Sequence, residues 1–188
     1  MLLPTLTMSG ASMGPISHAV IDIVNSPSIT SVEKKNIDLT LEEEKIRTKK
    51  AESIDAYFRA RGMPLEGTGM KMVLEAEKND LDWRLLPAIS VRESTGGKHA
   101  CKKATYSAFG WGSCKINFKS NEHGIETVAH NLGGNNPKTA HHYDDKTTKE
   151  ILRAYNPPSI VPRYAEQVMA IMDNIGDREV GNTLATLN

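Results

Sequence analysis

The sequence predicts a mainly α-helical protein. Apolar residues recur at helical spacing in several segments between residues 40 and 176. Clusters of Gly and Pro separate these segments. No strand-like pattern longer than four residues occurs outside "CKINFKS". At 188 residues, the chain suits one compact domain with additional tail.

The first 39 residues are expected to form a flexible leader. They mix Pro, Ser, Thr and Asn with one short apolar patch, "HAVIDIV", that has no similar partner nearby. The opening "MLLPTLTMSGASMG" lacks the positive region and the longer apolar core of a secretory signal, so a signal peptide is not evident.

A charged helix is predicted within residues 40–64. Thr40 and Glu43 have the spacing of a capping box, and no helix breaker follows until Gly62. The first half of the segment is almost wholly charged. Apolar residues gather in the second half, which is therefore expected to reach the core through Ile54, Tyr57 and Phe58.

The next helix is expected in "GMKMVLEAEKND", residues 69–80. Thr68 is its expected N-cap, and Met70, Val73, Leu74 and Glu77 follow the helical period.

The helix after that is the predicted centre of the core. It begins near Asp82 as cap and is apolar on most faces. Pro87 is expected to remove one backbone hydrogen bond and to bend it, and Gly96 and Gly97 end it.

The remaining chain reads as loops and three further helices. Residues 98–120 form a loop or a short hairpin, and "NEHGIETVAHNL" a helix stopped by two glycines. After an irregular segment, Thr147 or Thr148 starts a helix that two prolines end. The last helix lies in "VPRYAEQVMAIMDNIG", on the stripe Tyr164, Val168, Ile171 or Met172, and Ile175, and residues 177–188 are a C-terminal tail.

Composition excludes several partners. With 23 basic and 23 acidic residues, the chain has no overall field to steer it toward nucleic acid or an anionic membrane. No apolar run reaches the roughly 20 residues of a membrane-spanning helix. We expect no nucleic-acid partner, no membrane span and no cofactor.

The two cysteines, Cys101 and Cys114, flank a loop rich in Gly, Ser and Lys that lacks a helical stripe. A disulfide would stabilise such a loop by about 3 kcal/mol in the chain-entropy model, and it is the expected state. The alternative is a pair of reduced thiols in a cytosolic protein.

Glu93 ends the most apolar stretch of the chain, "LLPAISVRES". Burial raises the pKa of a carboxyl group, which suits it to give and take a proton near neutral pH. The alternative is a structural ion pair with a base such as Arg92 or Lys98.

Four segments in this order, "ESTGG", "AFGWGS", "ILRAYNPP" and "YAEQVMAIM", resemble the lysozyme-like lytic transglycosylase domain of soluble lytic murein transglycosylases and goose-type lysozyme-like proteins. The resemblance covers residues 65–176. It implies a lysozyme-like helical catalytic domain with a glycan cleft there.

The resemblance also implies residue roles. Glu93 matches the catalytic acid and base, Ser94 the residue that supports it by hydrogen bonding, and Gly110 the glycine that lets backbone approach the sugar. Tyr155 and Asn156 match the pair that faces the cleft. Where many family members have Gly-Leu-Met-Gln, this chain has "GWGS", so a substrate-contacting glutamine is missing.

Aromatic residues near these positions fit a sugar-binding surface. Trp111, between two glycines, is expected to stack on sugar rings, whereas Phe109 is expected in the core. Tyr155 falls on an apolar helix face, and its hydroxyl needs a partner that Glu93 would provide.

The expected function is cleavage of the MurNAc–GlcNAc bond of peptidoglycan with Glu93 alone, in a secreted or cell-envelope protein. A hydrolase would need a second carboxylate about 5–9.5 Å away, and the candidates are Glu122, Glu126, Asp144 and Asp145. A third possibility is a wall-binding module that kept the fold without the chemistry.

Structural zinc is a further alternative. The candidate ligands are His99, Cys101, Cys114, His123, His130, His141 and His142. The twelve residues between the cysteines, rather than two to four, disfavour it, and no metal site is expected.

Overall fold

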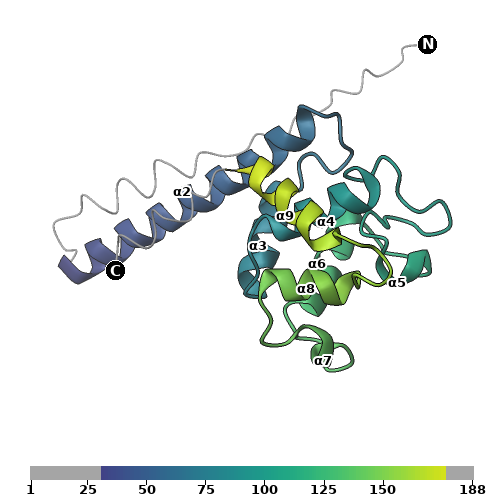
Figure 1. Ribbon diagram of the computed structural model, residues 1–188. Coiled ribbons are helices and arrows are strands. Elements are labelled where there is room, and N and C mark those ends of the chain that lie inside the picture. Colours follow the sequence, from purple (N-terminus) through teal and green to yellow (C-terminus); the bar gives the residue numbers. More distant parts are fainter. Residues whose placement is uncertain (1–30, 177–188) are drawn as a thin grey trace, which may run out of the picture. The chain divides into compact units, whose positions relative to one another are not determined.

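The computed structural model describes residues 31–176 (Figure 1). The expected leader up to residue 30 and the expected tail from 177 lie outside the described residues. Every regular element in the described part is a helix, which confirms the mainly α fold. The helices are α2 (Ser31–Arg59), α3 (Gly69–Lys78), α4 (Leu85–Ser94), α5 (Trp111–Cys114), α6 (Asn121–Leu132), α7 (Ala140–Tyr143), α8 (Thr148–Tyr155) and α9 (Tyr164–Ile175).

The chain divides into two compact units at the boundary between Glu43 and Glu44. The described part of the first unit, residues 31–43, is helical and belongs to α2. The expected leader is therefore wrong for residues 31–39. Thr40 does not cap a helix, because it lies inside one and its hydroxyl donates a hydrogen bond to the carbonyl of Asn36 at 2.9 Å.

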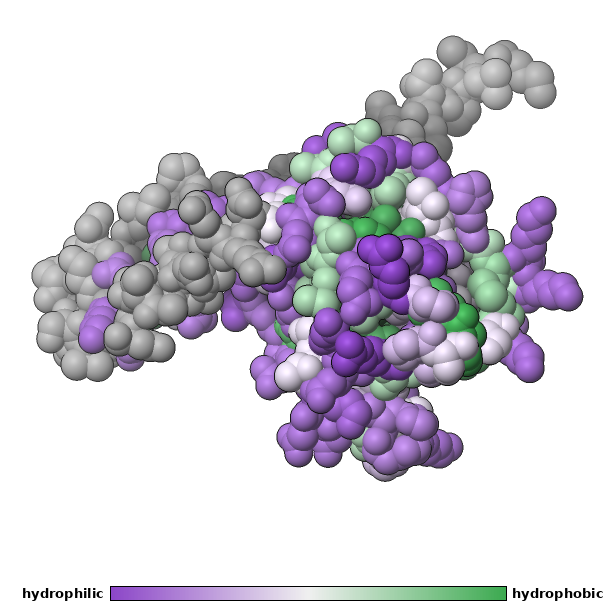
Figure 2. Space-filling model, viewed as in Figure 1, coloured by the Kyte–Doolittle hydropathy of each residue, from purple (hydrophilic) through white to green (hydrophobic). Residues whose placement is uncertain are grey.

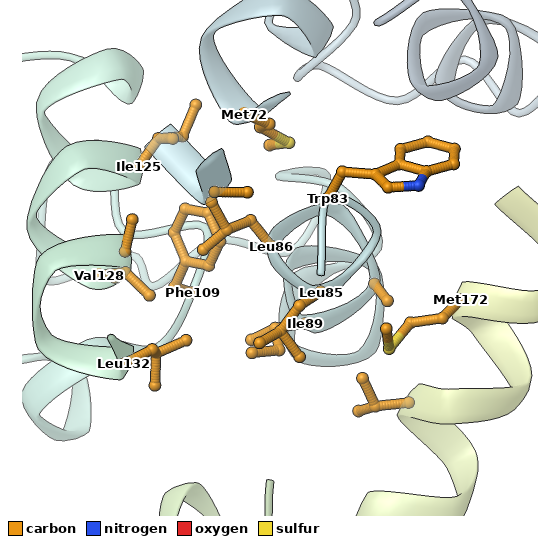
Figure 3. Close-up of a cluster of buried hydrophobic side chains, with 14 of the residues drawn as sticks. Met72, Trp83, Leu85, Leu86, Ile89, Phe109, Ile125, Val128, Leu132 and Met172 are labelled. Atoms are coloured by element: carbon orange, nitrogen blue, oxygen red, sulfur yellow. The ribbon is translucent and has the colours of Figure 1, made fainter. Parts of the chain in front are cut away.

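Helix α4 lies at the centre of the second unit, as its apolar sequence predicted. It packs against α9, α3 and α6. Figure 3 shows three of its fully buried side chains, Leu85, Leu86 and Ile89, between residues of α6 and Met172 of α9. Burial of such side chains is worth roughly 1.5–3 kcal/mol each, so this helix anchors the core.

The start of α4 differs from the prediction in two ways. The helix begins at Leu85, with Arg84 rather than Asp82 at the N-cap position. The Asp82 carboxylate accepts a hydrogen bond from the backbone N–H of Arg84 at 2.9 Å and pairs with its guanidinium at 2.7 Å. Pro87 is then the third helical residue. An amide in the first turn has no intrahelical acceptor, so this proline removes no bond and gives no reason for a bend.

Helix α3 is capped from α2 and not by its own neighbour. The carboxylate of Asp55 accepts hydrogen bonds from the backbone N–H groups of Gly67 at 2.8 Å and Gly69 at 3.0 Å. Thr68 stands at the N-cap position, as predicted, but its side chain makes no capping bond, since its hydroxyl donates to the carbonyl of Leu65 at 2.7 Å. An acceptor from a distant part of the chain therefore supplies the anion that a helix N-terminus favours.

The buried face of α3 is turned relative to the predicted stripe. Met72, Val73 and Ala76 are fully buried. Met70 and Leu74 are 36% and 46% exposed, so the prediction was wrong for these two. Local periodicity was ambiguous here because apolar residues occupy both sides of the helix.

The segment from 98 to 120 contains only the single turn α5, and no strand forms in this described stretch. Hydrogen bonds join Thr105 to the stretch at 117–118. The backbone N–H of Phe118 donates to the Thr105 carbonyl, the Thr105 N–H donates to the Asn117 side chain, and the Thr105 hydroxyl lies within bonding distance of the Phe118 carbonyl and the Asn117 side chain. Cys101 and Cys114 form a disulfide with Cα atoms 5.7 Å apart, which confirms the pairing.

The last helices follow their predicted patterns. Ser120 caps α6 through the N–H of His123, and Thr147 with Glu150 forms a complete capping box at α8. In α9, Met172 is buried and Ile171 only partly so, which settles the open alternative on its stripe. One short turn, α7, lies in the segment expected to be irregular.

Among residues 31–176, no helix combines the length and apolar character needed to cross a bilayer.

We predict that Gly69→Ala destabilises the fold. A Cβ atom at position 69 would lie 2.4 Å from the backbone carbonyl oxygen of Ala51. Relieving this contact should cost about 1–3 kcal/mol in urea unfolding. Gly124→Ala is the control, because its Cβ would meet its nearest neighbour at 3.4 Å and should gain up to about 1 kcal/mol of helix propensity. Equal stability of the two variants would contradict the close approach of α2 and α3.

Candidate functional site

Glu93 is the next-to-last residue of α4 and is half-buried. The helix ends directly after it because Thr95, Gly96 and Gly97 all have positive φ, at 55°, 61° and 98°. The buried helix α4 therefore places this carboxyl group at its C-terminal end, where the chain changes direction.

The carboxyl group of Glu93 is held by Tyr164, the first residue of α9. The tyrosine hydroxyl donates to Oε1 at 2.6 Å. Burial raises the pKa of Glu93, while the hydrogen bond from Tyr164 and the charge of Arg92 lower it in part, and the net shift is upward. Burial also raises the pKa of Tyr164, so this hydroxyl keeps its proton and acts as a donor.

Gly110 allows the loop backbone to approach Glu93. Its φ is +62°, and a Cβ atom there would lie 3.1 Å from Oε2 of Glu93. A side chain at this position would be strained and would crowd the carboxyl oxygen that Tyr164 does not bind. The resemblance implied that Gly110 lets the backbone approach a sugar; in this structure the group that the backbone approaches is the Glu93 carboxyl.

Ser94 does not support Glu93 in the way that the resemblance implied. Its hydroxyl lies within bonding distance of the carbonyls of Ala108, at 2.6 Å, and Ser90, at 3.1 Å, and it accepts from the N–H of Gly97 at 2.9 Å. Ser94 is buried and is not among the residues that line the pocket described below. It fastens the loop that carries Gly110 to the end of α4.

Tyr155 also has a different partner from the expected one. Its hydroxyl donates to the backbone carbonyl of Phe109 and not to Glu93. Phe109 itself is 1% exposed, as expected for a core residue. Tyr155 therefore fixes the position of the loop, and Tyr164 takes the role at the carboxyl group.

Four aromatic rings follow one another beside Glu93. Trp111 lies between Tyr143 and Tyr155, with ring centroids 6.3 Å and 5.7 Å away, and Tyr155 stacks on Tyr164 at 5.9 Å with an angle of 10°. Such offset arrangements add to the stability that burial provides.

A pocket of about 520 Å³ opens at this row of rings. Glu93, Gly110, Trp111, Tyr155 and Asn156, five of the six predicted site residues, line it. The other lining residues are Gly112, Ser113, Tyr143, Pro157 and Ile160. A smaller pocket of about 260 Å³ shares Asn156 and is bordered by Tyr164, Arg153, Arg163 and Glu166.

Glu93 is the one carboxylate among the residues that line the larger pocket. None of the four candidates for a second acid lines either pocket. Glu126 instead lies 3.7 Å from the ammonium group of Lys71, on the exposed side of α6.

The candidate zinc ligands are not assembled. Cys101 and Cys114 are bonded to each other, and no three His, Cys, Asp or Glu side chains come together as metal ligands in the described part of the chain.

Sequence reasoning missed two residues of this site, Tyr164 and Tyr143. Tyr164 was assigned to the buried stripe of its helix, and it is indeed 2% exposed. The overlooked signal is its hydroxyl, which must find a partner when the ring is buried. Tyr143 sits in a segment without periodicity, and nothing local distinguishes it.

Comparison of the chain with protein-family models, with curated proteins and with solved structures yields no match.

We predict that Tyr164→Phe raises the pKa of Glu93. The lost hydrogen bond stabilises the charged carboxylate, so the carboxyl group should hold its proton to a higher pH without it. A ¹³C NMR titration of the Glu93 side chain measures this directly. Tyr155→Phe is the matched control, since its hydroxyl bonds Phe109, and should move the titration little. An unchanged or lower pKa in Tyr164→Phe would contradict the assignment.

A second prediction concerns stability. Because the folded pKa of Glu93 lies above the unfolded one, its contribution to stability is lost as pH rises from the ordinary glutamate range through the raised pKa. A glutamine side chain does not ionise, so Glu93→Gln removes this loss of stability at higher pH. Above this window the variant should melt at a higher temperature than the wild type, and the difference should vanish in acid. Glu52→Gln, which removes the same charge from an exposed position of α2, is the control, and thermal melts from pH 3 to 8 compare the three proteins.

Proposed function

We propose that this protein cleaves the glycan strands of peptidoglycan as a lytic transglycosylase of the lysozyme-like type. The observation that carries the proposal is the half-buried Glu93, with its raised pKa, facing a pocket beside Gly110 and hydrogen-bonded by Tyr164. A carboxyl group that holds its proton near neutral pH is the equipment of a general acid. Residues 65–176, which carry the resemblance to that family, contain the whole pocket.

In the proposed reaction, Glu93 first donates its proton to the oxygen between MurNAc and GlcNAc. The bond from C1 of MurNAc to that oxygen breaks, and GlcNAc leaves with a hydroxyl group. The carboxylate then takes the proton of the C6 hydroxyl of MurNAc, whose oxygen bonds to C1. This closes a 1,6-anhydro ring, returns the proton to Glu93 and consumes no water.

The set of carboxylates favours this route over hydrolysis. Hydrolysis by two carboxylates needs a second acid within about 9.5 Å. Among the residues lining the larger pocket, Glu93 has no such companion. Tyr164 supports the first step, because its hydroxyl donates to the carboxylate that forms when the proton leaves.

The walls of the pocket suit a carbohydrate. Trp111 and Tyr143 offer aromatic surface, and Asn156 offers amide groups for hydroxyls. Ile160 also lines the pocket and is 72% exposed, so a bound ligand would cover its apolar side chain and remove it from water. The disulfide fits a protein that works outside the reducing cytosol, in the cell envelope or secreted.

We predict that Glu93→Gln lowers cleavage of purified peptidoglycan by a factor of about 10²–10⁴, the usual contribution of a general acid and base. Mass spectrometry of the released fragments should find 1,6-anhydro ends from the wild type. Glu126→Gln, a charge-matched change outside the pocket, should cleave normally.

Three other results would each reject part of the proposal. Fragments with only reducing ends would make the protein a hydrolase. Full activity of Glu93→Gln would mean that another residue is the acid. Binding of peptidoglycan without any cleavage by the wild type would indicate a wall-binding module.

A further inference from the structure

The neutral total charge conceals an uneven distribution. Residues 94–121 contain five lysines and neither aspartate nor glutamate. Removing these five from the 23 basic residues leaves 18 in the rest of the chain, against all 23 acidic ones. The segment between Glu93 and Glu122 is therefore cationic, and it is the segment that forms one side of the larger pocket.

A disulfide and several hydrogen bonds hold together the two stretches that carry most lysines of this segment. The disulfide joins Cys101 to Cys114, and the bonds of Thr105 to Phe118 join the two stretches again a few residues further on. Each cysteine is followed directly by lysine. We call the surface of Lys102, Lys103, Lys115 and Lys119 the lysine lobe.

The lobe has no internal counter-charge. All four side chains are exposed, and none forms an ion pair with another described residue. The fifth lysine of the segment, Lys98, differs because its ammonium group donates to the carbonyl of Arg61 at 2.6 Å. Figure 2 shows long hydrophilic side chains projecting from the surface around α5 and the loop before it. Like charges that are held together this way repel one another until an anion approaches.

The lobe is continuous with the pocket. Gly110, Trp111, Gly112 and Ser113 lie between the lysines in sequence and line the pocket in space. Exposed apolar side chains accompany the lysines, with Tyr106 51% and Ile116 40% exposed. A polymer whose backbone enters the pocket would therefore pass side branches over this surface.

We propose that the lysine lobe binds the carboxylate-bearing peptide branches of the polymer whose glycan backbone occupies the pocket. This inference rests on the proposed function and names the feature of the substrate that the protein selects. Lysine suits such branches, because its ammonium group is a mobile point charge that needs no fixed partner geometry. The lobe contains no arginine, the residue enriched where phosphates are bound in a fork-like geometry.

The test separates binding from cleavage. Binding is measured by co-sedimentation of Glu93→Gln protein with purified peptidoglycan at about 50 mM salt, a concentration at which surface charges are weakly screened. Changing the four lobe lysines to Gln should weaken binding about tenfold, the sum of four modest exposed interactions. Converting the peptide carboxyl groups of the peptidoglycan to amides should weaken binding of the unchanged lobe by a similar factor.

A matched variant controls for total charge. Lys35, Lys49, Lys138 and Lys146 are exposed lysines elsewhere, and changing these four to Gln removes the same charge. This control should bind native peptidoglycan as tightly as the parent. Equal losses in both quadruple variants would overturn the lobe, since only net charge would then matter.

Cleavage assays with active protein distinguish the two proposals. With native Glu93, the lobe variant should cut amidated peptidoglycan at the parent rate and native peptidoglycan more slowly. If the parent cuts neither polymer, the proposed function fails, while the sedimentation result still decides whether the lobe binds carboxylates. Insensitivity of binding to amidation, or tighter salt-sensitive binding to double-stranded DNA, would overturn the carboxylate assignment.

Discussion

The candidate site depends on one contact between two helices, where the end of α4 meets the beginning of α9. Tyr164 can hold the Glu93 carboxyl only while these ends stay together, and the extensive packing of α4 on α9 keeps them there. Their fully buried side chains fix the geometry far more strongly than the single hydrogen bond does. The core thus positions the Glu93 carboxyl group. Burial beside the same core disfavours the charged form of that group.

A second set of constraints brings the loop to that carboxyl. Ser94 bonds the carbonyl of Ala108, and Tyr155 bonds the carbonyl of Phe109, so two consecutive peptide groups before Gly110 are fastened from α4 and α8. Gly110 then passes close to Glu93 without a side chain. These two polar residues act on the loop backbone, and they shape the pocket without touching the carboxyl group.

Local sequence patterns predicted most of the helices well, because periodic burial depends on neighbours along the chain. The core position of α4, the start of α8 near Thr147 and the stripe of α9 all followed from such patterns. Two of the predictions that failed concerned partners from distant parts of the chain. Asp55 took the capping role expected of Thr68, and Tyr164 took the one expected of Tyr155. The packing of helices that are distant in sequence decides which hydroxyl or carboxylate occupies a site. No single segment of the sequence encodes that packing.

The placement of positive charge around Glu93 makes the two proposals compatible, because attracting an anionic polymer then need not conflict with keeping an acid protonated. A cation close to a carboxyl group lowers its pKa, and Arg92 does so here, yet burial outweighs it. The lysine side chains of the lobe are exposed, so water and salt screen their effect on the pKa of the half-buried Glu93. Their attraction acts instead on ligands that approach through solvent. A fold that keeps its cations outside the pocket can therefore attract carboxylates without ionising its own buried carboxyl group.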